Sequence, residues 1–156
     1  STRKESSAAS DVYKRQEVAR ETMKASGGHL IVIASVAGLL HYPYASVYAK
    51  CKRALIQIAD AYRRSLADYQ ITVTTLVPGY IDTPRLREIY RNDLSKCPFC
   101  MPLNRAVETM TKAIAQRKAL VVFPPKMRLS IALLSLLPTC LLSAFMHRKT
   151  LWSIPK

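Results

Sequence analysis

The sequence predicts an α/β protein with about three parallel strands, and three observations support this prediction. Residues 30–34 form a continuous apolar run between turn residues, which is typical of a strand buried on both faces of a parallel sheet. Residues 71–77 are rich in β-branched side chains, which favour a second strand. The connection between them is long and helix-patterned, so the two strands are expected to be parallel. Residues 119–123 predict a third strand, which two prolines close.

Helices are predicted between and after these strands. A helix over residues 45–68 repeats apolar residues at three- and four-residue spacing, so one face should be buried: Leu55, Ile58, Ala59, Tyr62 and Leu66. Its charged residues are expected mostly away from that face: Arg53, Asp60, Arg63 and Arg64. Thr83 and Pro84 predict the cap and start of a short helix through Tyr90. Another helix should begin at Asn104 or Val107 and end at Arg117.

Three polar side chains can meet at the end of the first strand. Ser35 ends that strand, while Tyr48 and Lys52 are four residues apart and therefore share one face of the next helix. Open α/β sheets bind ligands at the carboxyl ends of their strands. A phenol titrates near a pKa of about 10, and a nearby ammonium group would lower the pKa of Tyr48. Tyr48 could then exchange a proton with a carbonyl or alcohol oxygen.

The order of these features is more specific than the Tyr-x-x-x-Lys pair, which a chain rich in Tyr and Lys contains by chance. After the pair come the second strand and the run Pro78-Gly79-Tyr80-Ile81-Asp82-Thr83. This order of features resembles the short-chain dehydrogenase/reductase family. The family pattern has a strand that ends in Ser, here Ser35, then a loop, here with Gly38, then the Tyr-x-x-x-Lys pair, and then Pro-Gly with a Thr four residues after the Gly. The alternative is a coincidental basic α/β fragment.

The resemblance implies the C-terminal half of a Rossmann-like, doubly wound parallel sheet and an NAD(P)-dependent oxidoreductase. Such an enzyme transfers a hydride between nicotinamide and a carbonyl or alcohol, and the hydride must come from the cofactor because no side chain of the trio carries electrons. In this family Tyr48 would be the acid/base, Ser35 would orient the substrate oxygen, and Lys52 would bind the nicotinamide ribose. The nicotinamide end of NADP or NAD would contact six residues: Tyr48, Lys52, Pro78, Gly79, Ile81 and Thr83.

The resemblance also predicts partners, namely a small-molecule carbonyl or alcohol and, for the complete protein, a homodimer or tetramer. The Tyr42-Pro43-Tyr44 loop and the apolar tail favour a hydrophobic substrate. Three family features are absent from the chain. Its four glycines form no phosphate-binding loop, no residue that would select NAD or NADP is present, and the catalytic Asn has no counterpart upstream of Ser35. We therefore expect this chain to be the C-terminal part of a reductase and to be inactive alone.

The tail is basic and apolar. The formal charge is +14, and residues 104–156 hold nine Lys and Arg against Glu108 alone. This charge would attract an anionic lipid surface or nucleic acid, but no nucleic-acid-binding module is recognisable, so we predict no nucleic-acid partner. Residues 129–146 contain no charge and predict one apolar helix with a polar stripe of Ser135, Thr139 and Ser143.

Three placements of this helix remain open. It could lie on a membrane surface through residues 126–149, pack on the substrate side of the protein, or span the bilayer, in that order of preference. The alternative function follows from the first placement: a non-catalytic basic protein bound peripherally to a membrane. No signal peptide is evident, so the predicted location is cytoplasmic, with peripheral contact to the cytoplasmic membrane.

Cys97 and Cys100 form a single Cys-x-x-Cys between prolines. A zinc site would need two further ligands, and the histidines form no paired motif, so we predict no metal and ordinary loop cysteines. Three segments follow from these observations. Residues 1–16 are expected to be disordered or artefactual, residues 17–125 to be the C-terminal part of the catalytic domain, and residues 126–156 to be the tail helix.

Overall fold

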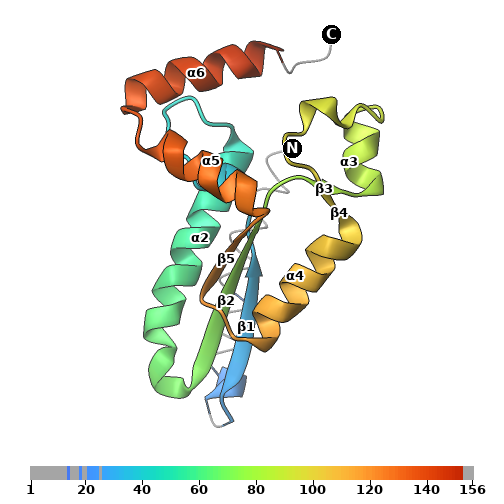
Figure 1. The fold of residues 1–156 in the computed structure, drawn as a ribbon. Helices are drawn as coiled ribbons and strands as arrows, with labels where there is room; N and C mark the ends of the chain where they lie inside the picture. The colour runs from blue at the N-terminus through green and yellow to red at the C-terminus, as the bar shows by residue number, and fades with distance from the viewer. Residues whose placement is uncertain (1–13, 15–17, 19–20, 25, 153–156) are drawn as a thin grey trace.

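A three-stranded parallel sheet lies at the centre of the fold (Figure 1). The structure is a computed structural model that describes residues 14, 18, 21–24 and 26–152, with side chains up to residue 146. The segment 1–16, predicted to be disordered, lies outside the described residues apart from residue 14. The strands are β1 (Gly28–Ile33), β2 (Ile71–Pro78) and β5 (Leu120–Phe123), in the order β1–β2–β5. The predicted α/β class and parallel sheet are confirmed.

The register of the sheet brings the functional segments to one edge. Gly28 to Ile33 pair with Ile71 to Leu76, and Thr75 to Pro78 pair with Leu120 to Phe123. All three strands therefore end on the same side of the sheet, where Ser35 follows β1 and Gly79 follows β2.

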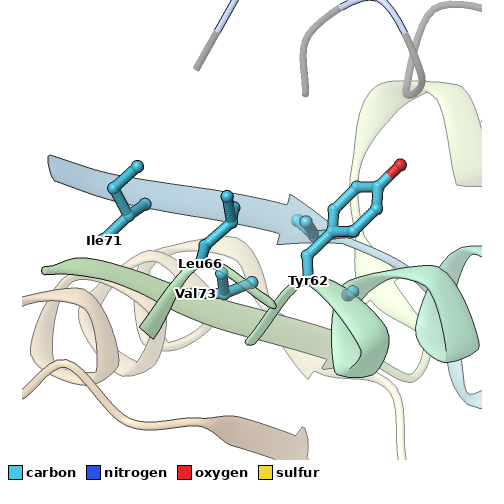
Figure 2. Close-up of a cluster of buried hydrophobic side chains, with 6 residues drawn as sticks. Tyr62, Leu66, Ile71 and Val73 are labelled. Atoms are coloured by element: carbon cyan, nitrogen blue, oxygen red, sulfur yellow. The ribbon is translucent and has the colours of Figure 1, made fainter. Parts of the chain in front are cut away.

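Helix α2 (Val47–Ser65) covers one face of β1 and β2. Of its predicted apolar face, Ala59, Tyr62 and Leu66 are buried, and Leu55 and Ile58 are partly buried. Tyr62 and Leu66 pack on Ile71 and Val73 of β2 (Figure 2). The helix begins at the Ser46 cap, whose hydroxyl accepts from the Ala49 N–H at 3.2 Å. It ends before the predicted residue 68, and the chain continues as the 3₁₀ helix η2 (Ala67–Tyr69) into Gln70, whose φ is +57°.

Arg63 corrects the expectation that the charged residues of this helix lie mostly away from the core. Its guanidinium donates to the carbonyl of Val73 in β2 at 3.2 Å and to the carbonyl of Ala119, just before β5, at 2.7 Å. It also donates to the hydroxyl of Thr75, a fully buried residue, at 2.9 Å. Asp60 accepts from Arg63 at 2.8 Å, so one side chain ties α2 to β2 and to the segment entering β5.

The opposite face of the sheet is covered only in part. Helix α4 (Leu103–Ala115) packs Ala106 and Ala113 against Leu76 and Phe123 of β2 and β5. Strand β1 is an edge strand, and its side chains Ile31 and Ile33 on this face are exposed. The prediction that residues 30–34 are buried on both faces is therefore wrong for this structure, because α4 packs on β2 and β5 rather than on β1.

The segment between β2 and α4 contains a small second sheet that the sequence did not predict. Strand β3 (Ile81–Asp82) pairs in parallel with β4 (Met101–Pro102). Between them lie α3 (Pro84–Ile89) and the 3₁₀ helix η3 (Leu94–Lys96). Thr83 caps α3 as predicted, because its hydroxyl accepts from the Leu86 N–H at 3.2 Å. These elements build a layer above the carboxyl ends of the main strands.

The tail forms two helices rather than one. Helix α5 (Pro125–Ser135) ends before Pro138, and α6 (Thr139–Trp152) begins after it. Pro138 has no N–H, and its ring would clash with the Leu134 carbonyl in a continuous helix. The predicted stripe of Ser135, Thr139 and Ser143 is therefore split between two helices. Among the described residues, no helix is long and apolar enough to cross a membrane.

Candidate active site

Ser35 lies immediately after β1 and starts the loop that leads to α2. It caps the 3₁₀ helix η1 (Val36–Gly38), and its hydroxyl oxygen accepts from the Ala37 N–H at 3.3 Å. A hydroxyl that accepts from the backbone keeps its own O–H as a donor. Ser35 can therefore present a proton to an oxygen atom placed over the end of the sheet.

Tyr48 and Lys52 occupy successive turns at the start of α2, as the spacing predicted. The Lys52 ammonium donates to the Ile33 carbonyl, the last of β1, at 3.3 Å. The same nitrogen lies 5.7 Å from the centroid of the Tyr48 ring, within the range of a cation–π contact. The Lys52 charge is thus held between the end of β1 and the face of the phenol ring, while the Tyr48 side chain stays exposed.

The loop that carries Ser35 is fastened directly onto α2. A Cβ atom at Gly38 would lie 2.7 Å from the backbone nitrogen of Arg53 and 2.7 Å from the carbonyl carbon of Lys52, so only glycine permits this contact. The Arg53 guanidinium donates to the carbonyls of Gly38 and Leu40. Arg53 was expected mostly to face away from the core, and its role in fixing this loop was missed, because helical spacing does not show how far a long side chain reaches.

Replacing Gly38 by alanine is expected to push the loop away from α2, because the atoms it meets are backbone and cannot move aside. Ser35 would then be displaced from Tyr48, and the fold should lose about 1–3 kcal/mol of stability, as is usual for overpacking. Thermal unfolding of the variant measures this loss. Gly28→Ala is a matched control, since its added Cβ meets only the flexible Met23 side chain. Equal stability of the two variants would contradict the role given to Gly38.

Ser35 and Tyr48 line the same cavity, which has a volume of about 1020 Å³. Gly79, Ile81 and Thr83 also line it, so five of the seven predicted site residues are brought together. Lys52 and Pro78 are not among the lining residues. Lys52 lies beside the cavity, on the Tyr48 ring. Most of the other lining side chains are apolar, and several come from the tail: Met127, Ile131, Leu133, Leu134, Phe145 and Met146.

Gly79, Tyr80, Ile81 and Thr83, which follow β2, form one wall of the cavity. The Gly79 N–H donates to the Phe123 carbonyl at 2.7 Å, and a Cβ at Gly79 would lie 3.1 Å from Pro124. Glycine therefore lets this turn pack against the start of α5. The Thr83 hydroxyl accepts from the backbone, as Ser35 does, and so keeps its O–H as a donor toward the cavity.

Other titratable groups near the cavity are poorly suited to proton transfer. Burial, with a hydrogen bond to Tyr90, raises the pKa of Tyr80 far above its ordinary value. Burial and the nearby Cys100 raise the pKa of the Cys97 thiol, and burial and the nearby Asp82 carboxylate raise the pKa of the Cys100 thiol. Both shifts favour the predicted ordinary loop cysteines over reactive ones. Within the described part of the chain, no group of three or more His, Cys, Asp or Glu side chains could hold a metal ion.

Comparison with solved structures shows the same fold. A short chain dehydrogenase from Burkholderia cenocepacia, in complex with NADP, superposes with a TM-score of 0.66 at 18% identity over 86% of this chain and 58% of its own. A 4-hydroxyisoleucine dehydrogenase mutant, complexed with NADH and succinate, gives a TM-score of 0.59 at 22% identity over 74% of this chain and 53% of its own.

Curated relatives agree at the level of sequence. The Xenopus tropicalis dehydrogenase/reductase SDR family member 7B is 41% identical over 56 residues, which are 36% of this chain and 18% of that protein. An uncharacterized oxidoreductase of Myxococcus xanthus is 28% identical over 121 residues, which are 78% of this chain and 46% of the relative. The chain thus spans about half or less of the proteins it matches.

A family model described as short chain dehydrogenase matches residues 8–94, more than half of the chain. The matched range includes β1, the Ser35 loop, the Tyr48–Lys52 pair and the turn after β2. The oxidoreductases named above share this fold or this sequence. The chain belongs to the short-chain dehydrogenase/reductase family of oxidoreductases.

Proposed function

We propose that this chain carries the proton-transfer and nicotinamide-side part of an NAD(P)-dependent enzyme that interconverts a carbonyl and an alcohol. The observation that supports this most is the shared cavity of Ser35 and Tyr48, with the Lys52 ammonium held on the Tyr48 ring. Three groups of this kind suffice to bind, polarise and protonate a carbonyl oxygen.

Each residue has a distinct part in the proposed reaction. The Ser35 O–H donates a hydrogen bond to the carbonyl oxygen and holds it beside Tyr48. The Tyr48 phenol gives its proton to this oxygen as negative charge develops there, and the nearby Lys52 ammonium stabilises the phenolate that remains. When bound, the nicotinamide cofactor supplies the hydride in this direction and accepts it in the reverse one. In alcohol oxidation the Tyr48 phenolate takes the hydroxyl proton.

The residues of the cavity fit the nicotinamide end of NAD or NADP. The Thr83 hydroxyl offers a donor for an amide, and the Lys52 ammonium, anchored at the Ile33 carbonyl, offers one for ribose hydroxyls. Gly79 and Ile81 complete this side of the cavity. The Burkholderia relative with NADP and the dehydrogenase with NADH support the same cofactor class.

The lining of the cavity favours a hydrophobic substrate. Leu40, Leu86 and Phe99 face it from the body of the protein, and Ile131 and Leu134 face it from α5. A cavity of about 1020 Å³ is at the upper end of the range that holds drug-sized ligands. We therefore propose a bulky or long apolar ketone, aldehyde or alcohol as the substrate class.

Residues 1–156 by themselves are expected to bind NADPH or NADH too weakly to saturate at submillimolar concentration. The chain contains no glycine-rich loop to hold the pyrophosphate, so only the nicotinamide end would be contacted. Without contacts to the pyrophosphate, the binding free energy should be weaker by several kcal/mol. Each 1.4 kcal/mol of lost binding free energy lowers the affinity about tenfold. Calorimetric titration of either nucleotide measures this, and a micromolar dissociation constant would contradict it.

Activity is tested in a chimaera in which residues 27–156 follow the part of the Burkholderia cenocepacia dehydrogenase that this chain does not match. This chimaera is expected to oxidise NADPH in the presence of a hydrophobic ketone. A chimaera that folds and binds NADPH but turns over no carbonyl substrate would leave the alternative, a non-catalytic basic protein. For the complete protein we further propose a cytoplasmic homodimer or tetramer, which light scattering would test.

A further inference from the structure

The outer surface of the tail is unusually apolar. The four most exposed leucines of α5, α6 and the turn between them are Leu129 at 62%, Leu133 at 59%, Leu136 at 80% and Leu141 at 57%. We call these four residues the leucine face. Single exposed leucines are common on soluble proteins. Leu129, Leu133 and Leu136 recur at four- and three-residue spacing, so they lie on one side of α5, and such a set marks an interaction surface.

The charged residues of the tail itself are all positive. Lys126 and Arg128 are exposed in the first turn of α5, and Arg148 and Lys149 follow in the sequence of α6. From residue 109 to residue 156 the chain contains no Asp or Glu. The tail therefore combines exposed apolar side chains with uncompensated cations, and this combination complements an anionic lipid surface.

Part of the lining of the cavity with Tyr48 is also exposed on the tail. Leu133 and Phe145 line the cavity and are exposed, while Ile131 and Leu134 of α5 line it and are half-buried. Figure 1 shows α5 and α6 beyond the carboxyl ends of the strands, near the start of α2. Ser35 follows β1 at these same ends. The tail thus has one side in the cavity and the other facing outward.

We propose that the leucine face docks on an anionic lipid membrane and places the mouth of the cavity at the bilayer. Leu129, Leu136 and Leu141 insert among the acyl chains at the interface, while Lys126 and Arg128 contact anionic headgroups. An apolar substrate dissolved in the lipid can then enter past Leu133.

A second copy of the chain is a less suitable occupant of the leucine face. A two-fold interface sets the same surface against itself, so it brings the Lys126 and Arg128 charges of both copies into one interface. No acidic residue of the tail could compensate these charges. Like charges brought together in this way oppose association, whereas anionic headgroups would attract them.

The test is flotation of the full chain with phosphatidylcholine vesicles that do or do not contain phosphatidylserine. We expect binding to the phosphatidylserine vesicles and partial release by salt. Removing one basic residue near an anionic surface costs about fivefold in binding, so the double variant Lys126→Gln, Arg128→Gln should bind about twenty-five-fold less. The combined variant Leu129→Ser, Leu136→Ser, Leu141→Ser should lose more than about tenfold. None of these five residues lines the cavity.

The matched control replaces three comparably exposed apolar residues elsewhere: Ile89→Ser, Leu103→Ser and Val107→Ser. It should bind vesicles like the unchanged chain, and circular dichroism should show the same helix content in all variants. Absence of flotation by the unchanged chain, or equal loss in the control, would overturn the proposal. Self-association that the leucine substitutions abolish, without vesicle binding, would also overturn it and would identify a second copy as the occupant. Catalytic activity does not enter this readout, so its result is independent of the proposed reaction.

Discussion

Replacing Tyr48 by phenylalanine is expected to lower the turnover of the chimaera by about 10²–10⁴-fold, the range for loss of a general acid or base. The substitution removes only the hydroxyl, so the ring remains in place against the Lys52 ammonium, 5.7 Å from its centroid. Affinity for NADPH should therefore change little. Steady-state kinetics and a fluorescence titration with NADPH measure the two quantities separately.

Two further variants sharpen this test. Tyr44→Phe is the matched control, because Tyr44 is exposed four residues earlier and does not line the cavity, so turnover should stay within about twofold. Lys52→Ala should lower both turnover and affinity for NADPH, since Lys52 is placed beside both Tyr48 and the end of β1. If Tyr48→Phe and Tyr44→Phe behaved alike, Tyr48 would not be the acid/base.

Replacing Arg63 by alanine is expected to lower the free energy of unfolding by about 3 kcal/mol. The side chain is only 26% exposed and donates to Val73, Thr75 and Ala119. Hydrogen bonds from a charged donor contribute about 1.5–3 kcal/mol each. In the variant, water would replace part of these bonds at the sheet edge. The buried Thr75 hydroxyl would lose its partner. Urea unfolding of the chimaera measures the change.

Arg64 provides the control for this prediction on the same helix. It also pairs with Asp60, at 2.6 Å, but its side chain is 74% exposed. An exposed ion pair contributes about 0–1 kcal/mol, so Arg64→Ala should cost well under 1 kcal/mol. A loss of stability as large in Arg64→Ala as in Arg63→Ala would show that the contacts of Arg63 with the sheet contribute little.

The strands and the Tyr48–Lys52 face could be predicted because they follow from local periodicity. An apolar run predicts a strand, and four-residue spacing on a helix places two side chains on one face. The exposure of Ile31 and Ile33 could not be predicted in this way, since an apolar run does not say which elements cover it. The small sheet of β3 and β4 was also missed, because strands of two residues have no periodicity to detect.

The long side chains and the tail show two further limits of local reasoning. Arg53 and Arg63 lie outside the apolar face of α2 by their spacing. Their long side chains still reach the loop that carries Ser35 and the sheet, respectively, and residue spacing does not reveal this reach. The uncharged run 129–146 predicted one helix, but Pro138 within this run divides it into α5 and α6. Residues of α5 and α6 line the cavity, so the tail packs on the protein, which is one of the three predicted placements. Contact of its exposed leucines with a membrane remains a proposal.

Hydride transfer at the Tyr48 site is tested most directly by following deuterium. The chimaera would be incubated with a hydrophobic ketone and NADPH deuterated at one or the other C4 position, and the alcohol product analysed by mass spectrometry. The account predicts that one of the two cofactors delivers a single deuterium to the carbinol carbon, and that Tyr48→Phe slows this delivery by about 10²–10⁴-fold. A folded chimaera that binds NADPH and yields no deuterated alcohol with either cofactor would contradict the proposed function.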